Sequence, residues 1–393
     1  MKKIKLLMLL LPIFLFTGCF NYRELNEIAI ASAIGLDKTG DGYVVTIQVM
    51  NTKKASETGT SNDQLKFITF TTSGVTLQDA IRKSILDSSR RIYPNHVQTL
   101  IIGEDLAKNG ISDVLDMFFR GVEFRKQTSV LIAKNSTAEE VLNVVTPLES
   151  LNSKNIRDGL SVDSKYLGIG DNISFEDLVG TFLDSNKEII LPSVSINGTK
   201  SDGEKIENIE TADPSVRLIE SSLAVFKGDH LVGFLDNKQS IDLNFVRNKI
   251  NNTILTYECG DNKYLSSEIM SNKTSVEFLE SPLKAHIKIN GILSINEITC
   301  DMDLEDPVVI DEIEADLEEE LKNDVYNTIK YIIEEYNSDV FGFRDFLYKN
   351  KTKYYKEIKD DWYDSIFPNM DIDVDVNFNL TGKGNALEVI RRD

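Results

Sequence analysis

Between residues 66 and 145 the chain alternates three times between a short apolar run and a longer amphipathic run. The apolar runs at 66–71, 97–102 and 128–133 have the length of strands, whereas the runs at 75–90, 104–120 and 137–145 have helical spacing. A crossover helix between two strands favours parallel pairing, because the chain must return to the same end of the sheet. This region therefore predicts a β-α unit with an at least partly parallel sheet.

Two of these helices carry more detailed signals. A capping box of Ser136 and Glu139 is expected to begin the helix at 137–145. The helix at 75–90 is expected to place one set of side chains on a single face: Leu77, Ala80, Ile81, Ser84 and Ile85.

In the rest of the first half, turn residues and the alternation of apolar and polar residues predict the secondary structure. Runs at 28–36 and 43–50 flank a polar, glycine-containing turn and predict a hairpin, followed by a Ser/Thr/Asn-rich loop at 51–64. Residues 152–172 are polar and are expected to be irregular. Ser174 then caps a short helix through Leu183, and a strand follows at 188–196.

The second half does not repeat this alternation of strands and helices. Strands at 218–226 and 230–235 flank the turn Gly228-Asp229, a short helix follows at 241–249, and strand-like runs occupy 253–259, 275–279 and 283–295. Residues 308–336 repeat apolar side chains at helical spacing, 339–361 are helical and aromatic, and 370–380 alternate as a final strand. This half is expected to be a mostly antiparallel sheet packed on one long helix.

The 393 residues are enough for two or three domains, and we expect a mixed α/β (α+β) multi-domain chain. Residues 1–18 are assigned to a signal peptide and 19–196 to an N-terminal domain, in which the alternating unit at about 66–145 is a candidate subdomain. Residues 197–214, rich in charge and glycine, are expected to be a linker, and 215–393 a C-terminal domain.

The N-terminus has the pattern of an export signal. Lys2, Lys3 and Lys5 precede an apolar run at 6–16, which is too short to cross a hydrocarbon core of ~30 Å as a helix. The run ends in Leu15-Phe16-Thr17-Gly18-Cys19, which resembles a lipobox, with Phe16 in the usual place of Leu. An ordinary cleavage site with a chance cysteine is the alternative.

Lipidation would make Cys19 the mature N-terminus, and two acyl chains are enough for stable anchoring. The protein would then be attached to a membrane without spanning it. The formal charge is −20, and residues 1–18 contain no acidic residue to offset their lysines. Because like charges repel within a Debye length of ~8 Å, the body is expected to stand off an anionic leaflet unless a partner holds it.

Two further cysteines, Cys259 and Cys300, both end strand-like runs. A disulfide between them is possible in an exported domain. Two unpaired, small, apolar core residues are the favoured interpretation, because nothing in the sequence forces the two thiols to meet.

Patterns for catalysis and cofactors are absent from the sequence. It contains three His (His96, His230 and His286), no His-Glu-x-x-His or Cys-x-x-Cys motif, no P-loop and no Gly-x-Ser-x-Gly elbow. Gly168-Ile169-Gly170 lacks the third glycine of a dinucleotide site and predicts a turn. His96 is expected to cap backbone groups of its turn. No catalytic residue, metal or cofactor is therefore expected, and the negative charge argues against nucleic acid.

Two acidic stretches are candidate binding sites. One begins the long helix, around residues 301–320, and the other alternates Asp371, Asp373 and Asp375 with apolar residues. A calcium loop starting at Asp371 would need glycine at its sixth position, which is Val376. Solvated acidic faces are the favoured interpretation of both.

Several segments together resemble the Ger(x)C (GerAC-like) family, the lipoprotein C subunits of spore germinant receptors. The resemblance begins at Cys19 and continues through Ile34-Gly35-Leu36-Asp37, although Phe20 and Asn21 replace the family's usual Trp-Asp. It runs in order to about Gly382 through these segments: His96, Ile102-Gly103-Glu104, Leu106-Ala107, Leu115-Asp116, Arg120, Ala224-Val225-Phe226-Lys227, Leu231-Val232-Gly233-Phe234-Leu235, Asp339-Val340-Phe341-Gly342-Phe343, Trp362 and Phe367-Pro368.

The resemblance implies a non-catalytic sporulation lipoprotein on the outer face of the inner spore membrane. It would work with two integral membrane subunits, A and B, in a complex that senses nutrients and triggers germination. Only Cys19 is carried over from the family, as the lipid-bearing residue. Whether this subunit contacts the nutrient stays open.

Two functions of other classes were considered. A solute-binding lipoprotein that delivers a small molecule to a membrane transporter would need two similar lobes around a cleft, and the two halves differ in rhythm. A lipid-anchored hydrolase of spore peptidoglycan would need paired carboxylates in a cleft, for which the acidic stretches are the sole support.

Overall fold

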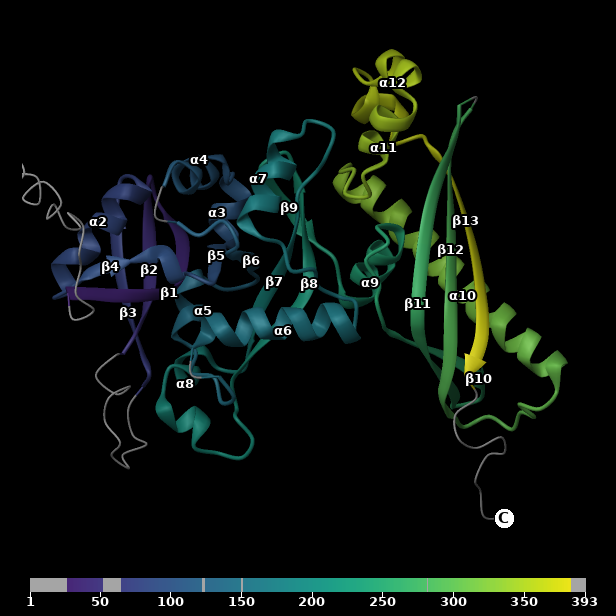
Figure 1. Cartoon of the computed structure of the whole chain (residues 1–393), viewed down its shortest axis with the longest axis horizontal. Helices are drawn as coiled ribbons and strands as arrows, with labels where there is room; N and C mark the ends of the chain where they lie inside the picture. The colour runs from purple at the N-terminus through teal and green to yellow at the C-terminus, as the bar shows by residue number, and fades with distance from the viewer. Residues whose placement is uncertain (1–26, 52–64, 122–123, 150, 281, 383–393) are drawn as a thin grey trace, which may run out of the picture.

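The computed structural model describes residues 27–51, 65–121, 124–149, 151–280 and 282–382. Two sheets form its framework. Figure 1 shows them in separate halves, with one long helix against the second sheet. β1 to β9 make up the first sheet and β10 to β13 the second. The mixed α/β class expected from the sequence is confirmed.

The first sheet has a parallel centre and antiparallel margins. Its order is β3-β2-β1-β5-β6-β7-β8-β9; β1, β5, β6 and β7 run parallel, and the short β4 pairs in parallel with β1. The strands are β1 (Ile28–Thr39), β2 (Gly42–Met50), β3 (Phe67–Gly74), β4 (Arg91–Tyr93), β5 (Thr99–Gly103), β6 (Ser129–Ala133), β7 (Ile190–Asn197), β8 (Arg217–Lys227) and β9 (His230–Phe234). The partly parallel sheet predicted from the alternation is thus present.

Helices cover both faces of this sheet because its central strands are apolar on both sides. One core holds α2 (Leu77–Asp87), α3 (Glu104–Asn109), α4 (Ser112–Arg120) and α7 (Phe175–Leu183). The opposite core holds α5 (Ala138–Asn143) and α6 (Asn152–Tyr166). β5 illustrates the division, since Leu100 and Ile102 enter the first core and Ile101 the second.

Three local expectations were wrong. The helix expected at 104–120 is divided into α3 and α4, since Gly110 between them has φ 107°, which ends a helix. The capping box of α5 is formed by Thr137 and Glu140, one residue later than expected. The segment expected to be irregular contains the 15-residue α6, which packs Ile156 and Leu160 on the sheet under a polar outer face.

The expected linker at 197–214 stays a prediction, but the assignment of the next two strands to the second half needs correction. The segment contains α8 (Lys200–Gly203) and η4 (Ile206–Ile209), and the buried Asn208 donates to Val145 O at 3.1 Å and Val216 O at 2.9 Å. β8 pairs with β7, and β9 pairs with β8, so both strands belong to the first sheet. The two sheets therefore divide after β9, while the division into folding units stays a prediction.

The second sheet agrees with its expected form. Its order is β10-β11-β12-β13, antiparallel except for the parallel pair β12–β13. The strands are β10 (Ile254–Gly260), β11 (Lys263–Glu280), β12 (Leu283–Ile298) and β13 (Asp371–Gly382). One face is covered by α10 (Pro307–Tyr331), whose buried side chains include Ile313, Leu317, Leu321, Val325 and Ile329. The sheet packed on one long helix is confirmed.

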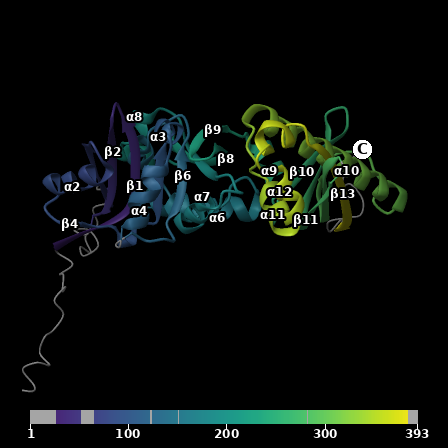
Figure 2. The ribbon, with the colours of Figure 1, turned by 90° about the horizontal axis from the view of Figure 1, so that it is seen from above.

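Shorter helices connect the two halves. α9 (Asn237–Val246) lies between β9 and β10, and the π-helical turn η5 (Ile332–Tyr336) ends α10. α11 (Phe343–Asn350), α12 (Thr352–Ile358) and η6 (Trp362–Ile366) follow at one end of the second sheet (Figure 1). Figure 2 shows α9, α11 and α12 at the border between the halves from above.

A single strand contributes to the cores of both halves. Leu223 and Val225 of β8 belong to the core around α10 and the second sheet, whereas Ala224 and Phe226 belong to the core of the first sheet. Side chains alternate across a strand, so β8 has one face in each core. The halves are therefore packed on each other and are not joined by a loose connection.

Cys259 and Cys300 form a disulfide, with their Cα atoms 6.2 Å apart. The favoured interpretation of two unpaired core cysteines was wrong. Cys259 lies in β10, and Cys300 follows β12 and is buried. The sheet order brings them together because β11 pairs with both strands.

Candidate functional site

The expected lipidation site, Cys19, and its lipobox residues Leu15, Phe16, Thr17 and Gly18 lie outside the described residues. Their role stays a prediction. The described chain begins at Glu27, and β1 follows at once, with Ile28 opposite Arg91 of β4. Glu27 therefore lies beside β4.

His96 and the Gly-x-Gly segment belong to turns. His96 ends the 3₁₀ turn η3 (Pro94–His96), which is closed by Val97 N–H donating to Pro94 O at 3.0 Å. Its imidazole is exposed, and the capping bond that we expected is not among the hydrogen bonds of the described residues. The predicted turn at Gly168 to Gly170 is confirmed: it follows α6, and Gly170 N–H donates to Asp163 at 2.7 Å.

The acidic face of β13 lies against Lys284 and His286 of β12. His286 contacts Asp373 at 2.9 Å and Asp375 at 3.3 Å, and Lys284 approaches Asp373 at 3.4 Å and Asp371 at 3.7 Å. Hydrogen bonding to His286 and the charge of Lys284 hold the pKa of Asp373 below its usual value, against partial desolvation. Among the described residues, no group of three or more His, Cys, Asp or Glu is arranged to hold a metal ion.

Two glutamates of the acidic helix have a structural role that we did not expect. Glu318 Oε1 accepts a hydrogen bond from Phe378 N–H at 2.7 Å, and Glu314 Oε1 accepts one from Leu380 N–H at 2.6 Å. β13 is an edge strand, so these amides have no neighbouring strand to bond. The two carboxylates of α10 take the place of a further strand.

A polar contact joins the C-terminal helical segment to the first sheet. Tyr363 OH donates to Glu188 Oε1 at 2.5 Å, and Glu188 Oε2 accepts from Gly228 N–H at 2.7 Å. We call the whole set of polar contacts between these two parts the joint. It also includes the hydrogen bonds from Ser338 Oγ to Phe226 O (2.5 Å), from Tyr336 OH to Phe234 O (3.1 Å), from Arg344 Nη1 to Ser185 O (3.0 Å) and from Tyr355 OH to Asn186.

Asp339 is the buried acid of the joint. Its carboxylate accepts hydrogen bonds from the backbone N–H groups of Gly342 (3.1 Å), Phe343 (3.0 Å) and Arg344 (2.7 Å), at the start of α11. Burial raises the pKa of Asp339 to about 7, although these bonds favour the charged form. The side chain therefore holds the entry to α11 in a fixed geometry.

Two other carboxyl groups are buried away from the joint. Burial raises the pKa of Glu220, in β8 under α6, to about 7, and the nearby Asp163 adds to the effect. Glu220 Oε1 is buried without a hydrogen-bond partner. Burial also raises the pKa of Asp242 to about 7, although Thr328 Oγ1 donates to it at 2.8 Å. These groups lie in separate places in the fold.

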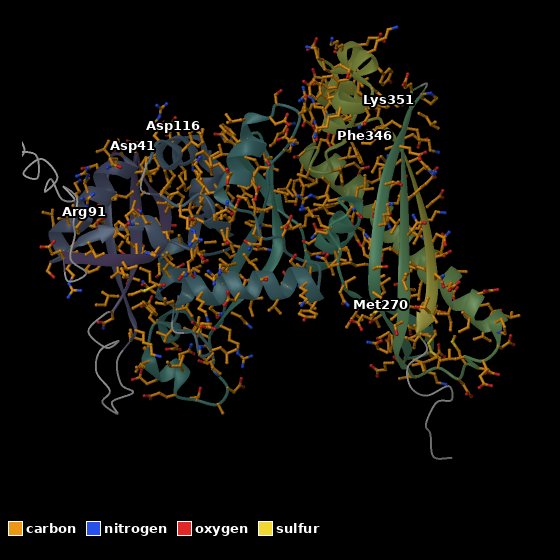
Figure 3. All side chains as sticks on the ribbon, in the orientation of Figure 1. Asp41, Arg91, Asp116, Met270, Phe346 and Lys351 are labelled. Atoms are coloured by element: carbon orange, nitrogen blue, oxygen red, sulfur yellow. A yellow bond between two sulfur atoms is a disulfide. The ribbon has the colours of Figure 1, made fainter. Side chains whose placement is uncertain are left out.

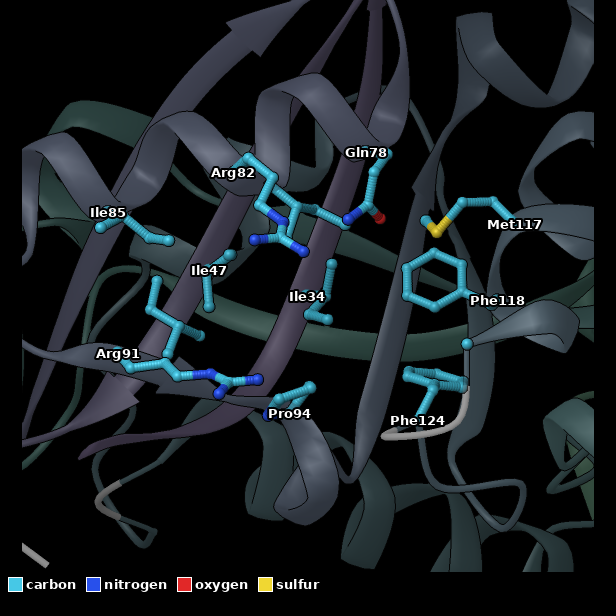
Figure 4. A pocket seen from close by; sticks show the side chains of 13 residues that line it. Ile34, Ile47, Gln78, Arg82, Ile85, Arg91, Pro94, Met117, Phe118 and Phe124 are labelled. Atoms are coloured by element: carbon cyan, nitrogen blue, oxygen red, sulfur yellow. The ribbon is translucent and has the colours of Figure 1, made fainter. Parts of the chain in front are cut away.

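The feature best suited to binding is a groove of about 380 Å³ at the end of the first sheet. Its floor is formed by β1 and β2, with Ile34 and Ile47, and its walls by α2, β4 and the end of α4. Figure 4 shows Arg82 reaching over it from α2 and Arg91 from β4. The complete lining is Ile34, Ile47, Gln78, Ile81, Arg82, Ile85, Arg91, Ile92, Pro94, Met117, Phe118, Gly121 and Phe124.

Two guanidinium groups therefore lie beside an apolar floor. We did not single out these arginines from the sequence. The signal was present, since residues 75–96 hold four Lys or Arg and two Asp in a strongly acidic chain. Ile85 was also misplaced: it was expected on the buried face of its helix, yet it is 47% exposed at the rim of the groove.

The two halves are not similar lobes. One contains a nine-stranded mixed sheet and the other a four-stranded sheet with a single long helix. The groove lies within the first half and not between the two. A solute-binding lipoprotein of two matched lobes therefore has no support in this fold. No helix in the described ranges is long and apolar enough to cross a membrane.

Comparison with protein families gives two matches in order along the chain. Residues 21–196 match the spore germination protein N-terminal domain. Residues 221–384 match the family described as spore germination B3/GerAC like, C-terminal.

Individual proteins are similar over almost their whole length. Spore germination protein KC of Bacillus subtilis (strain 168) is 28% identical over 376 residues, which cover 93% of this chain and 92% of that protein. Spore germination protein B3 of the same organism is 22% identical over 383 residues, covering 94% and 95%. The crystal structure of the GerBC protein has the same fold, with a TM-score of 0.57, 17% identity and coverage of 92% of this chain and 99% of that chain.

Proposed function

The chain belongs to the GerAC-like family of spore germination proteins, and we propose that it is the lipid-anchored C subunit of a spore germinant receptor. The observation that carries this proposal is the ordered match of both family domains over residues 21–196 and 221–384. Spore germination proteins KC and B3 align with it nearly end to end.

The proposed anchor is a diacylglyceryl group on the thiol of Cys19, with an acyl group on the new N-terminus. The charged start, the apolar run at 6–16 and the small residues before Cys19 support this. Anchoring would hold the protein on the outer face of the inner spore membrane. At that place it can contact the extracytoplasmic parts of membrane proteins.

We propose that the protein is not an enzyme and that it acts by docking on the integral A and B subunits. A protein of this kind contributes affinity, position or a second conformational state, and any change of state must come from contacts that differ between the states. The packing of the two halves through β8 supports a single body that presents a fixed surface to its partners.

The first experiment is a detergent pull-down of the tagged protein from purified inner spore membrane, after expression with its membrane partners during sporulation. We expect two polytopic subunits to co-purify in a defined ratio. Recovery of the protein with a transporter permease, or alone under conditions that preserve membrane complexes, would contradict the receptor assignment.

The anchor has a separate test. In sporulating cells given labelled palmitate, the parent should incorporate label and a Cys19→Ala variant should not. A variant with both Cys259→Ser and Cys300→Ser is the matched control, because it removes the other two thiols and should still be labelled. Label on the Cys19→Ala protein would refute the proposed attachment site.

A further inference from the structure

β10 forms an open edge of the second sheet. It pairs with β11 on one side, and no described strand lies on its other side. Ile269 N–H donates to Thr253 O at 2.8 Å, which makes these two residues a hydrogen-bonded pair. Because bonded and non-bonded pairs alternate along an antiparallel ladder, the backbone N–H and C=O groups of Ile254, Thr256 and Glu258 point away from β11. Within the described ranges these outward groups have no hydrogen-bond partner.

The opposite edge of the same sheet is closed. Glu318 and Glu314 of α10 accept hydrogen bonds from the outward amides of Phe378 and Leu380 in β13. In the described chain no carboxylate does this for the outward amides of β10. An edge strand that is neither capped nor covered can accept a strand from another chain. The edge of this sheet that is available for pairing is therefore β10.

A pocket of about 250 Å³ lies beside this edge, between β10, α9 and α10. Its apolar lining is Ile241, Ile254, Leu255, Leu317 and Leu321. Successive side chains of a strand point to opposite faces, so a strand added to β10 would direct alternate side chains towards α10 and this pocket. Figure 3 shows Arg91, at the groove of the first sheet, in the opposite half of the molecule from Met270 of β11. The pocket beside β10 is therefore a separate feature from that groove.

The pocket is acidic. Asp242, Glu320 and Asp324 line it together with one cation, Lys238, which is ion-paired with Asp324. Thr328 donates to Oδ2 of the buried Asp242, whose other oxygen has no hydrogen-bond partner among the residues that the structure describes. Partial burial and the charge of Asp324 raise the pKa of Glu320, although Lys238 opposes this. The acids outnumber the cation, so a further positive charge would be stabilised here.

These features favour one kind of partner. The apolar walls can pack against the methylene stem of a Lys or Arg side chain, while the carboxylates contact its charged end. Residues 311–324 of α10 contain eight acidic residues and one Lys. A second copy of this chain is disfavoured, because pairing two β10 strands would bring two acidic pockets together. The complementary segment is therefore basic and extended.

We propose that the open edge of β10 is a docking site for an extended, basic segment of another protein. The segment adds a strand to the second sheet, its backbone pairs with the outward groups of β10, and one Lys or Arg enters the pocket beside Asp242 and Glu320. The disulfide between Cys259 and Cys300 ties the end of β10 to the segment after β12, so the edge is held in place before docking. This inference goes beyond the proposed function and does not depend on the lipid anchor.

The test uses the full-length protein in detergent and short fluorescent peptides. One peptide alternates Val with Lys, and a second of the same length alternates Val with Glu. The lysine peptide should bind about ten-fold more tightly by fluorescence anisotropy, and its affinity should decrease when salt is raised. Its binding should also slow amide hydrogen exchange in β10, because the outward N–H groups then become bonded.

A third peptide separates backbone pairing from charge. It has the lysine sequence with methylated backbone nitrogens, so it keeps the charge and cannot donate to β10. It should bind about ten-fold more weakly than the unmodified lysine peptide. Thr256→Pro makes the matching change in the protein, since Pro is tolerated on an edge strand where the N–H faces outward. This variant should also bind the lysine peptide about ten-fold more weakly.

A charge variant tests the pocket without changing the backbone. Glu320→Gln should weaken binding of the lysine peptide about five-fold, which corresponds to the loss of one partly exposed ion pair. Glu319→Gln, at an exposed position of α10 outside the pocket, changes the net charge equally and should bind like the parent. Denaturant titration of each variant checks that the fold is retained.

Several outcomes would overturn the proposal. Equal binding of the lysine and glutamate peptides would exclude the acidic pocket, and equal binding of the methylated peptide or unchanged exchange in β10 would exclude strand addition. A dimer of the parent that Thr256→Pro abolishes would show that a second copy occupies the edge. Failure of these tests would not affect the receptor assignment, because none of them contains a membrane subunit.

Discussion

Tyr363 donates a 2.5 Å hydrogen bond to Glu188, although 175 residues separate them in the chain. Burial and the charges of Glu188 and Asp339 raise the pKa of Tyr363, so the hydroxyl keeps its proton and remains a donor. Lys227 and Arg344 lie over the faces of the same ring, at 5.1 Å and 5.7 Å. The pair is therefore the polar centre of the joint.

Replacing Tyr363 by Phe should weaken the joint. The substitution leaves one oxygen of Glu188 without its donor, and hydrogen bonds to charged groups contribute about 2 kcal/mol. We expect the free energy of unfolding to fall by about this amount, and amide exchange in β9 and η5 to become faster. Denaturant titration and hydrogen exchange measure the two effects.

Tyr264→Phe is the matched control, because Tyr264 is a partly exposed tyrosine of β11. The free energy of unfolding of this variant should differ from that of the parent by less than about 0.5 kcal/mol. If Tyr363→Phe behaves like this control, the hydroxyl does not stabilise the contact between the halves.

Glu220 should make stability depend on pH. Its pKa is 4.5 in the unfolded chain and about 7 in the folded protein, so the folded state binds more protons between these values. The free energy of unfolding must then decrease as pH rises from about 4.5 to 7, by up to about 3 kcal/mol for this group, and level off above. Asp242 and Asp339 act in the same direction.

Glu220→Gln removes the buried charge with little change of shape. The variant should match the parent at pH 4, be more stable at pH 8, and lose less stability between them. Glu297→Gln, at an exposed position of β12, is the control and should follow the parent at every pH. If Glu220→Gln loses as much stability as the parent between pH 4.5 and 7, Glu220 does not cause the pH dependence.

The disulfide should stabilise the second half. Cys259 and Cys300 are 41 residues apart, and closing a loop of that length restricts the unfolded chain by up to about 4 kcal/mol. The double variant Cys259→Ser with Cys300→Ser should lose about 2 to 4 kcal/mol in denaturant titrations. Reductant should lower the stability of the parent and leave the double variant unchanged. Equal sensitivity of both proteins to reductant would indicate that the bond is not formed.

Removing the carboxylates that bond the edge of β13 should expose that edge. Glu314→Ala with Glu318→Ala leaves the amides of Leu380 and Phe378 without acceptors, so a second copy can pair with the strand. We expect a loss of about 2 kcal/mol and concentration-dependent association, measured by denaturant titration and sedimentation velocity. Glu319→Ala with Glu312→Ala, at exposed positions of α10, carries the same charge change and should stay unassociated.

Local patterns predicted most elements because the physical signals are local. Alternation of apolar and polar residues predicted β1 and β2, and the helical spacing of Leu317, Leu321 and Val325 predicted α10. Ser174 predicted the residue at which α7 begins. The failures also have local causes. α6 has few apolar residues and no side-chain N-cap, so its helical face was obscured by Asn, Ser and Asp. Gly110 interrupts a pattern that otherwise continues through α3 and α4.

Features that depend on the tertiary arrangement could not be predicted from periodicity. The contact of Tyr363 with Glu188 and the capping of β13 by Glu314 join segments that are far apart in sequence. The disulfide depends on β11 lying between its two cysteines. Ile85 fits the apolar face of α2 by spacing, but it lies at the rim of an open groove and is 47% exposed.

The position of β1 determines how the protein would respond to mechanical tension. β1 bonds to β2, β4 and β5 and lies inside the first sheet, so a pull on the chain before Glu27 acts along an interior strand. Several rows of hydrogen bonds would have to slide together, whereas an edge strand would peel away one bond at a time. An anchor at Cys19, as proposed above, would therefore load this sheet along an interior strand and in shear.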